Sequence, residues 1–430
     1  MDWLDLSMSK LKKYKFSELY DMSSGISSKP EQAGHGFPFV SFSTVFNNQF
    51  LPDALPDLMD TSEKERGTYS VKEGDIFLTR TSETLDELGM SSVAASDIPN
   101  ATYSGFLKRL RPTQSNISYH KFMAFYLRSK LFRKTMTNNA IMTLRASLNE
   151  QIFSYLDLLL PEYAEQKKIG DYLYLINQKI ALNNQINTEL EAMAKLIYDY
   201  WFVQFDFPDA NGKPYKSSGG KMVYNEALKR EIPERWGVGN IMQLTQLLGG
   251  GTPKTTMASF WGGSIPFFTP ADASSGVFSL ETKQNVTTEG LKSCSSKLFK
   301  KGTIFVTARG TVGKINIASC DMAMNQSCYA LQGKEGVGST FIYFYANELI
   351  QYVKSKASGS IFKALVTNDF KFTELVIPPV EVIARFSNTV DANFNKLLLN
   401  GLENRELTKL RDWLLPMLMN GQVTVKDTAS

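Results

Sequence analysis

The 430-residue chain is longer than one ordinary hydrophobic core supports, and its length predicts about two to four domains. Its 43% hydrophobic and 21% charged residues are typical of a soluble globular protein, and no apolar run approaches the roughly 18 residues of a membrane span. The net charge of +4 is compatible with nucleic-acid binding but too small to indicate it, and the first residues lack the pattern of a signal peptide.

Cysteine and histidine usage argues against several kinds of site. The three cysteines, Cys294, Cys320 and Cys328, have neither the spacing of a metal site nor that of a disulfide framework, which favours a reducing cytoplasm. Histidine, the commonest general acid or base, occurs only as His35 and His120. We therefore expect no bound metal, little basis for hydrolytic chemistry, and histidines that are structural or solvent-facing.

The first globular unit is predicted from about residue 10 to Pro161. It opens with a short amphipathic segment at 16–20, followed by a polar loop rich in Gly, Ser and Pro. β-rich segments follow, among them 39–42 and 76–80. A helix is expected at 119–137, because aromatic residues there keep a period near 3.6.

The second half of the chain repeats the first. The segment GDIFLTR at 74–80 returns as GTIFVTAR at 302–309, and the Leu-Leu-Pro ending at Pro161 returns as the Val-Ile-Pro ending at Pro378. Duplication of a whole unit predicts pseudo-two-fold symmetry and two similar surfaces, with loops that differ between the copies. Other corresponding segments are 241–248 with 16–20, 265–268 with the strand at 39, and 341–354 with the helix at 119–137.

Each copy ends in a long helical stretch, at 162–202 and at 380–419, with apolar residues at alternating steps of four and three. Both heptad seams carry two asparagines at equivalent steps. We interpret the seams as an intramolecular antiparallel coiled coil; the alternative is two unrelated surface helices with asparagines on a solvated edge. In the coiled coil Asn183 faces Asn404, Asn187 faces Asn400, Ile169 faces Leu418, Leu173 faces Leu414, Ile180 faces Leu407, and Trp201 faces Phe386.

Helices of about 40 residues span roughly 60 Å, so such a pair is expected to hold the two globular units as a rigid spacer. A central polar layer lowers stability but penalises slipped alignments.

No segment carries a complete catalytic motif. Glycine-rich segments at 249–254 and 310–314 resemble phosphate loops, but neither keeps the G-x-x-x-x-G-K-[ST] spacing, and no methyltransferase box or dinucleotide fingerprint is present. Nucleotide hydrolysis and a bound cofactor are therefore not expected. Carboxylates at 53–60 could contribute to a diffuse nuclease centre, although a solvated acidic loop is the simpler interpretation.

Candidate nucleic-acid contacts lie where the repeated strands end. Arg80 and Arg309 follow equivalent strands, and Lys314 lies just beyond the second. Arginine binds guanine or phosphate with two donors, and a glycine-rich turn lets backbone amides approach a phosphate closely. The alternative for Arg309 is a structural pair with a carboxylate.

Four further residues complete the candidate set. Thr252 and Lys254 lie in one loop, Lys29 lies in the corresponding region of the first copy, and Gln326 carries an amide suited to adenine edges. Asn325 with Gln326 alternatively caps a strand turn. Basic clusters at 108–111 and 128–134 could follow phosphates, although charged runs are more often solvated surface.

Together these residues resemble the specificity subunit of type I restriction-modification systems over nearly the whole chain. The resemblance rests on several motifs at once rather than on any single one. They are Trp236 with Leu244 and GGTPK at 250–254, WGGSIPF at 261–267, FVTARGTVGK at 305–314, AMNQS at 323–327, and the closing LRDWLLPML at 410–418.

The resemblance implies a non-catalytic subunit without cofactors that reads a bipartite, asymmetric target in double-stranded DNA. It implies two methyltransferase subunits on the spacer and restriction/translocase subunits in the full complex. The first copy departs from the pattern, because Thr-Ser-Glu follows Arg80 where the second copy has the glycine-rich turn. The alternative functions are an interaction scaffold and a stand-alone nuclease.

The predicted fold class is α+β, with two tandem α/β target-recognition domains, two long helices in an antiparallel coiled coil, and pseudo-two-fold symmetry. The predicted boundaries are 1–161 and 206–378 for the target-recognition domains, and 162–205 and 379–430 for the spacer helices.

Overall fold

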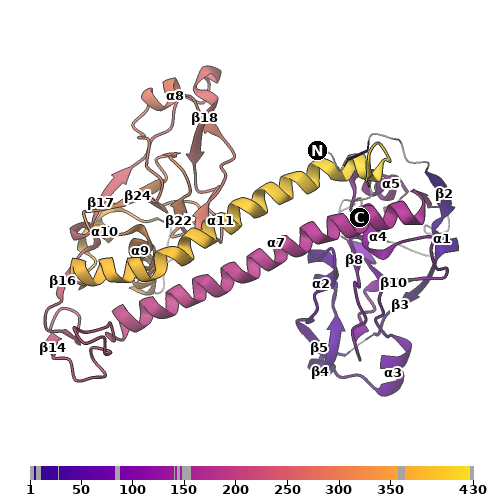
Figure 1. The fold of residues 1–430 in the computed structure, drawn as a ribbon, viewed down its shortest axis with the longest axis horizontal. Helices are drawn as coiled ribbons and strands as arrows, with labels where there is room; N and C mark the ends of the chain where they lie inside the picture. The colour runs from indigo at the N-terminus through magenta and orange to yellow at the C-terminus, as the bar shows by residue number, and fades with distance from the viewer. Residues whose placement is uncertain are drawn as a thin grey trace. The chain divides into compact units, whose positions relative to one another are not determined.

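The computed structural model describes residues 4–5, 11–27, 29–82, 88–139, 141–142, 146–147, 156–356 and 364–426 (Figure 1). The chain divides into two compact units. The first comprises Met1–Ile180 with Glu406–Ser430, and the second comprises Ala181–Arg405. Each unit is a mixed α/β body that includes part of both long helices, which are α7 (Tyr163–Tyr198) and α11 (Val380–Met419).

The first unit is built on a four-stranded antiparallel sheet in the order β3-β10-β6-β8, next to a three-stranded sheet in the order β5-β4-β9. Its elements are β1 (Leu4–Asp5), β2 (Lys12–Lys15), α1 (Phe16–Leu19), β3 (Tyr20–Ser24), η1 (Pro30–Gln32), β4 (Ala33–Val40), α2 (Phe42–Asn47), β5 (Asp57–Met59), α3 (Glu63–Thr68), β6 (Ile76–Thr79), β7 (Thr81–Ser82), β8 (Ser91–Val93), β9 (Thr102–Tyr103), β10 (Leu107–Pro112), α4 (His120–Tyr126), α5 (Lys130–Asn139), β11 (Ile141–Met142), β12 (Ala146–Ser147), β13 (Asp157–Leu160) and β26 (Thr424–Val425).

The second unit has the corresponding pair of sheets, in the orders β17-β24-β21-β22-β19 and β20-β18-β23. Its elements are η3 (Asp199–Val203), β14 (Met222–Asn225), β15 (Arg230–Pro233), β16 (Gly237–Gly239), η4 (Ile241–Gln243), β17 (Thr245–Gly249), η5 (Ala258–Phe260), β18 (Trp261–Phe268), β19 (Phe278–Ser279), β20 (Asn285–Val286), α8 (Thr288–Lys292), β21 (Ile304–Thr307), β22 (Ile315–Ala318), β23 (Ala323–Met324), β24 (Cys328–Gly333), α9 (Ser339–Lys356), α10 (Thr367–Phe372) and β25 (Leu375–Ile377).

The duplication extends to single backbone hydrogen bonds. The Gly74 amide donates to the Ala94 carbonyl at 3.0 Å, and the Gly302 amide donates to the Ala318 carbonyl at 2.9 Å. Both glycines have a φ near the left-handed region, 86° and 88°, which residues with a Cβ rarely adopt. The glycine that opens each copy of the repeated segment is therefore a requirement of the turn into β6 and β21.

The strands that flank this sheet repeat as well, down to an irregularity. In the first unit β4 carries a bulge, and Ala33 and Phe37 both pair with Met59. In the second unit β18 carries the same bulge, with Trp261 and Ile265 both paired with Val286. A bulge of this kind re-aims a strand, so its repetition fixes the same strand direction in both copies.

One predicted helix is wrong in length. Residues 119–137 form two helices, α4 and α5, rather than one, whereas the corresponding α9 is continuous. The break follows from Ser129, whose hydroxyl accepts a hydrogen bond from the Phe132 amide at 3.3 Å. A serine that satisfies an early amide in this way begins a new helix.

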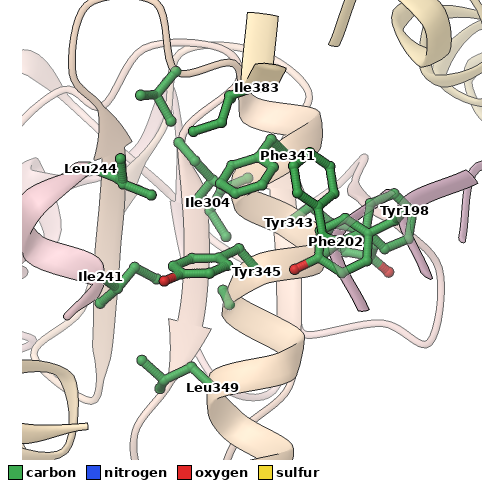
Figure 2. Close-up of a cluster of buried hydrophobic side chains, with 14 of the residues drawn as sticks. Tyr198, Phe202, Ile241, Leu244, Ile304, Phe341, Tyr343, Tyr345, Leu349 and Ile383 are labelled. Carbon is green, nitrogen blue, oxygen red and sulfur yellow. The ribbon is translucent and has the colours of Figure 1, made fainter. Parts of the chain in front are cut away.

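Aromatic side chains dominate the core of the second unit (Figure 2). Figure 2 shows Phe341 and Tyr345 of α9 between the strands of the sheet and two further aromatic residues, Tyr198 at the end of α7 and Phe202 in η3. The ring centroids of Phe202 and Phe341 are 5.0 Å apart, and the Phe202 and Trp236 rings are 5.9 Å apart. This cluster joins the long helix to the sheet, so the second unit packs as one body.

The two long helices pair in antiparallel fashion within each unit. In the second unit the Asn183 side chain donates to Asn404 at 2.9 Å, and Asn400 donates to Asn187 at 2.9 Å. These are the pairs that the heptad spacing places opposite each other. In the same unit the rings of Trp201 and Phe386 lie 5.9 Å apart. In the first unit the seam is apolar and fully buried at Ile169, Leu173, Leu414 and Leu418.

The asparagine pair of the second unit allows a direct test of the helix register. Asn400 is 1% exposed. We expect Asn400→Leu to lower the free energy of unfolding by about 1–3 kcal/mol, because the Asn187 amide loses its partner in a half-buried site. Adding Asn187→Leu should recover that loss or exceed it, because the layer becomes apolar on both sides. Urea unfolding of the full chain measures both changes, and equal midpoints for the single and double variants would contradict the register.

Candidate nucleic-acid interface

Several loops of the second unit emerge at one edge of its sheet. Strands β17 and β21 both pair antiparallel with β24, and both end where β24 begins. The register shows this, because Gly249 pairs with Tyr329 and Thr307 pairs with Cys328. The parallel strands β18 and β23 run out toward the same place, because the Asn325 amide donates to the Phe268 carbonyl at 3.0 Å. We call this surface the second loop edge; it comprises residues 250–254, 269–274, 308–314 and 325–327.

The structure brings Thr252 and Gln326 together on the second loop edge. The Thr252 hydroxyl donates to the Gln326 side-chain carbonyl, and both residues are exposed. Lys254 is also exposed, and its carbonyl accepts a hydrogen bond from the Trp261 indole at 3.3 Å. Asn325 instead caps the turn, accepting from the Ser327 amide at 3.0 Å. The amide of Gln326 therefore faces outward, whereas that of Asn325 serves the backbone.

The glycine-rich turn at 308–314 is held in shape from inside. The Thr307 hydroxyl donates to the Thr311 carbonyl and its oxygen accepts from the Lys314 amide at 3.0 Å. Gly310 and Gly313 both have a φ of 76°, so glycine is needed at each bend. A turn fixed in this way presents the same backbone surface to any ligand.

The turn carries two exposed cations. Arg309 is exposed, and within the described residues it forms no ion pair with a carboxylate. The ammonium of Lys314 lies 3.3 Å from the carbonyl of Ala273, and the Thr311 hydroxyl donates to the Pro270 carbonyl at 3.1 Å. The loop at 269–274 was not predicted from the sequence as part of the site. The one feature that indicates it is its position directly after β18, the strand that corresponds to β4 of the first unit.

The first unit has a corresponding edge, where β3 and β6 end and β10 begins. We call it the first loop edge; it comprises residues 25–27, 29–32, Arg80 and 104–106. Lys29 and Arg80 are both exposed there. The Lys29 backbone amide donates to the Gln32 side chain at 3.0 Å, which fixes the start of η1. Of the three residues that replace the glycine-rich turn after Arg80, Thr81 and Ser82 form β7, and Glu83 lies outside the described residues.

Backbone hydrogen bonds correct one correspondence between the copies. The Arg80 amide donates to the Phe106 carbonyl at 3.0 Å, and the Ala308 amide donates to the Ser327 carbonyl at 2.8 Å. Arg80 therefore occupies the place of Ala308, one residue before that of Arg309. The second copy has one more residue between the strand and its arginine, so the predicted equivalence of the two arginines is wrong by one position.

The basic cluster at 108–111 is not a phosphate track. Arg111 makes two hydrogen bonds with the fully buried Asp75 carboxylate, at 2.7 and 2.6 Å, and these hydrogen bonds raise the pKa of the guanidinium. Arg109 is 9% exposed and donates to the Ser70 carbonyl at 2.9 Å, and Lys108 is similarly buried. Lys108 and Arg109 are therefore buried inside the unit, and the half-buried Arg111 is held by partners distant in sequence.

The cluster at 128–134 is also partly structural. Arg128 donates to the carbonyls of Ser91 and Asn48 at 2.7 and 2.9 Å, and burial lowers its pKa to about 10. Its charge is satisfied by backbone oxygens and does not face a ligand. Arg128 therefore has a structural role, which is neither the phosphate contact nor the solvated surface considered for this cluster.

Other kinds of site have little support in the described ranges. No group of three or more His, Cys, Asp or Glu side chains there is arranged to hold a metal ion. Burial raises the pKa of the Cys328 thiol to about 12, which keeps it protonated and unreactive. A membrane-crossing helix is likewise not found among the helices of these ranges.

Two loop edges at equivalent backbone positions, each with exposed cations and loops of unlike sequence, define a duplicated protein with two similar loop-bearing surfaces. The family model described as "Type I restriction modification DNA specificity domain" matches residues 8–192 and 233–404. The chain belongs to this family.

Named relatives and a solved structure agree with that assignment. The chain is 27% identical over 470 residues to the type I restriction enzyme HindI specificity subunit of Haemophilus influenzae, covering 97% of this chain and 100% of that protein. It is 32% identical over 181 residues to the MjaIX specificity subunit of Methanocaldococcus jannaschii, covering 41% and 42%. The crystal structure of the type I restriction-modification S subunit from M. genitalium has the same fold, with a TM-score of 0.65, 13% identity, and coverage of 98% and 97%.

Two adjacent glycines, at the end of β17 and at the start of the second loop edge, provide a matched pair of variants. A Cβ at Gly250 would overlap the carbonyl oxygens of Met324 and Asn325, whereas one at Gly249 meets nothing within 4 Å. We expect Gly250→Ala to displace residues 250–254 and to cost about 1–3 kcal/mol of unfolding free energy. Gly249→Ala should change neither. Hydrogen exchange of the loop and urea unfolding report the two effects, and equal behaviour of the two variants would show that the close approach is not required.

Proposed function

We propose that this chain is the DNA sequence-specificity subunit of a type I restriction-modification complex and performs no chemistry itself. In this proposal the first and second loop edges read the two parts of a bipartite target in double-stranded DNA. The observation that carries it is one repeated backbone frame with unlike side chains at its two loop edges.

Unlike edges favour an asymmetric target. The second edge offers the outward amide of Gln326 beside Thr252, while the position equivalent to Gln326 in the first unit is Gly105. Identical readers recognise a palindrome, whereas readers with different side chains recognise two different half-sites. The loops would enter the major groove, where each base pair presents a distinct pattern of donors and acceptors.

The exposed cations suit contacts with the DNA backbone and with guanine. In this proposal the exposed Lys29, Lys254 and Lys314 bind phosphates, which would make the affinity fall with salt. Arg80 and Arg309 each follow a buried strand, so the backbone that carries them is held in place.

We further propose that residues 1–161 and 206–378 act as the target-recognition domains, and that 162–205 and 379–430 act as the spacer. The three cysteines are free, which fits a protein that works with DNA in the cytoplasm.

Exposed apolar residues on the long helices support docking of partner subunits. Leu182 and Leu196 on α7 are 51% and 67% exposed and lie two heptads apart. Leu399 and Trp413 on α11 are 61% and 52% exposed, with the same separation and at the equivalent steps of the repeat. Two equivalent apolar sets favour two copies of one partner, which we propose to be methyltransferase subunits; restriction/translocase subunits would complete the complex.

Mapping methylated adenines in host DNA by single-molecule sequencing tests the function as a whole. Deletion of this chain's gene should abolish methylation at one bipartite, asymmetric motif, and restoring the gene should recover it. Methylation that is unchanged by the deletion would reject the proposal. An interaction scaffold would instead show no preference among DNA sequences, and a nuclease would cut plasmid DNA with magnesium in the absence of partners.

Arg309 allows a test of half-site reading. We expect Arg309→Ala to cost about 1–3 kcal/mol in binding to one half-site and to relax specificity there, because a two-donor contact with guanine or phosphate is lost. Competition binding with duplexes altered in either half measures the effect. Arg235→Ala, at another exposed arginine of the same unit, is the control and should leave both halves unchanged. Equal loss at both halves with Arg309→Ala would argue against a half-site role.

The exposed helix residues allow a test of partner docking. We expect Leu196→Glu to reduce copurification of the methyltransferase subunit at least several-fold, because a charge replaces an apolar contact. Thr188→Glu adds the same charge at another exposed position of α7 and should have little effect. Full copurification with Leu196→Glu and with Trp413→Glu would show that these residues do not form the docking surface.

A further inference from the structure

Phe106 is an exposed aromatic residue on the first loop edge. Its side chain is 69% exposed, the largest value among the large apolar side chains of the described residues. It lies in the short connection between β9 and β10, beside Arg80, whose amide donates to the Phe106 carbonyl at 3.0 Å. An apolar ring therefore projects from the surface that we propose to face DNA.

The backbone under Phe106 is tightly held. The Gly105 amide donates to the Ile26 carbonyl at 2.7 Å, and the Phe106 amide donates to the Ser104 hydroxyl at 3.2 Å. The Leu107 amide then donates to the Ser104 carbonyl at 3.0 Å. Exposure of the ring is consequently not the result of a loosely placed loop, and little ordering of the backbone is needed when a ligand binds.

The same place in the second unit has different chemistry. The Phe106 carbonyl and the Ser327 carbonyl accept equivalent hydrogen bonds, from Arg80 and Ala308. Ser327 follows Gln326, which is exposed and bound to Thr252. One edge therefore presents polar groups where the other presents an apolar ring, at equivalent backbone positions. The sequence repeat contained this signal, but the aromatic residue was interpretable as core until its exposure was known.

We propose that Phe106 reads an A·T base pair in the half-site of the first unit by packing its ring against the C5 methyl group of thymine. The inference rests on the proposed function of the loop edges. Phenylalanine has no donor or acceptor, so it cannot read the polar edge of a base. The thymine methyl is the apolar group that base edges present in the major groove, and apolar side chains contact it there.

The neighbouring cations agree with this placement. Arg80 and Lys29 are exposed on the same edge, and cations at these positions would hold phosphates that flank the contacted base. The ring would then leave water when the edge docks, which supplies affinity as well as discrimination. Insertion of the ring between base steps is a different mode, in which the thymine methyl would have no special part.

Phe106→Ala combined with deoxyuridine substitution tests the contact, using the full chain with its copurifying subunits. Deoxyuridine lacks only the C5 methyl of thymine. For the wild type we expect one thymine of the first half-site whose replacement weakens binding by about three- to five-fold. Phe106→Ala should weaken binding by about ten- to a hundred-fold. In that variant the same deoxyuridine should cost nothing further, because the two changes remove one interaction.

Three controls separate this inference from misfolding. Phe106→Leu should retain most of the affinity and the deoxyuridine effect. Phe372→Ala should leave binding unchanged; Phe372 is 67% exposed, ends α10, which packs on η4, and belongs to neither loop edge. Discrimination at the second half-site should persist with Phe106→Ala.

Four results overturn the inference: no loss with Phe106→Ala, a loss that couples to no thymine methyl, loss at both half-sites alike, or a first half-site without an A·T pair. In all four cases, sequence-specific binding by the wild type leaves the proposed function standing, whereas absence of any sequence preference in the wild type rejects that function itself.

Discussion

Both loop edges depend on one close crossing of backbone segments. In each unit the loop after the first strand of the main sheet (β3 or β17) crosses the end of a strand of the second sheet (β9 or β23). There the Ile26 amide donates to the Tyr103 carbonyl at 2.9 Å, and the Gly251 amide donates to the Met324 carbonyl at 3.0 Å. The residue before each donor is glycine, because a Cβ atom would overlap the carbonyl oxygens beneath it. This crossing joins the two sheets of a unit and sets the origin of every other loop on the edge.

The repeated frame tolerates different chemistry as long as the geometry is kept. In the first unit a buried carboxylate, Asp75, is held by two donors of Arg111. At the equivalent positions of the second unit the Gln332 amide donates to the Thr303 hydroxyl at 3.1 Å. Breaking a buried ion pair strongly lowers stability, but the fold does not require an ion pair at this place. Neutral side chains of similar length can hydrogen-bond to each other there, and burying them costs less desolvation free energy than burying two charges. The two copies therefore preserve backbone positions while their side chains diverge, and the same divergence extends to the two loop edges.

The features that could be predicted from the sequence are those whose interacting residues lie close together along the chain. Helical periodicity and the spacing of Asn183 and Asn187 are local, so they were sufficient to place both long helices and to pair them. The partner of Arg111 is distant in sequence, and a run of basic residues on a strand looks like surface until that partner is known. Ser129 interrupted a helix that periodicity alone extends. The one-residue difference between Arg80 and Arg309 was hidden because residue identity, rather than backbone hydrogen bonding, guided the alignment.

The junction between each long helix and its sheet shows how far the copies have diverged. In the first unit a polar chain makes the connection: Arg411 donates to Asn177 at 3.0 Å, and Asn177 donates to Gln49 at 3.1 Å. In the second unit the residue equivalent to Asn177 is Phe394, which lies 5.7 Å from the Phe344 ring and 3% exposed in an aromatic cluster.

A polar chain and an aromatic cluster are difficult to exchange one residue at a time, because each mixed state leaves a partly buried polar group without a partner. Because α7 and α11 each contribute to both units, each sheet is matched in chemistry to the helix segments that it contacts. Replacing one loop edge by another without loss of folding therefore requires either that the loops alone are transferred or that the sheet is transferred together with these helix segments.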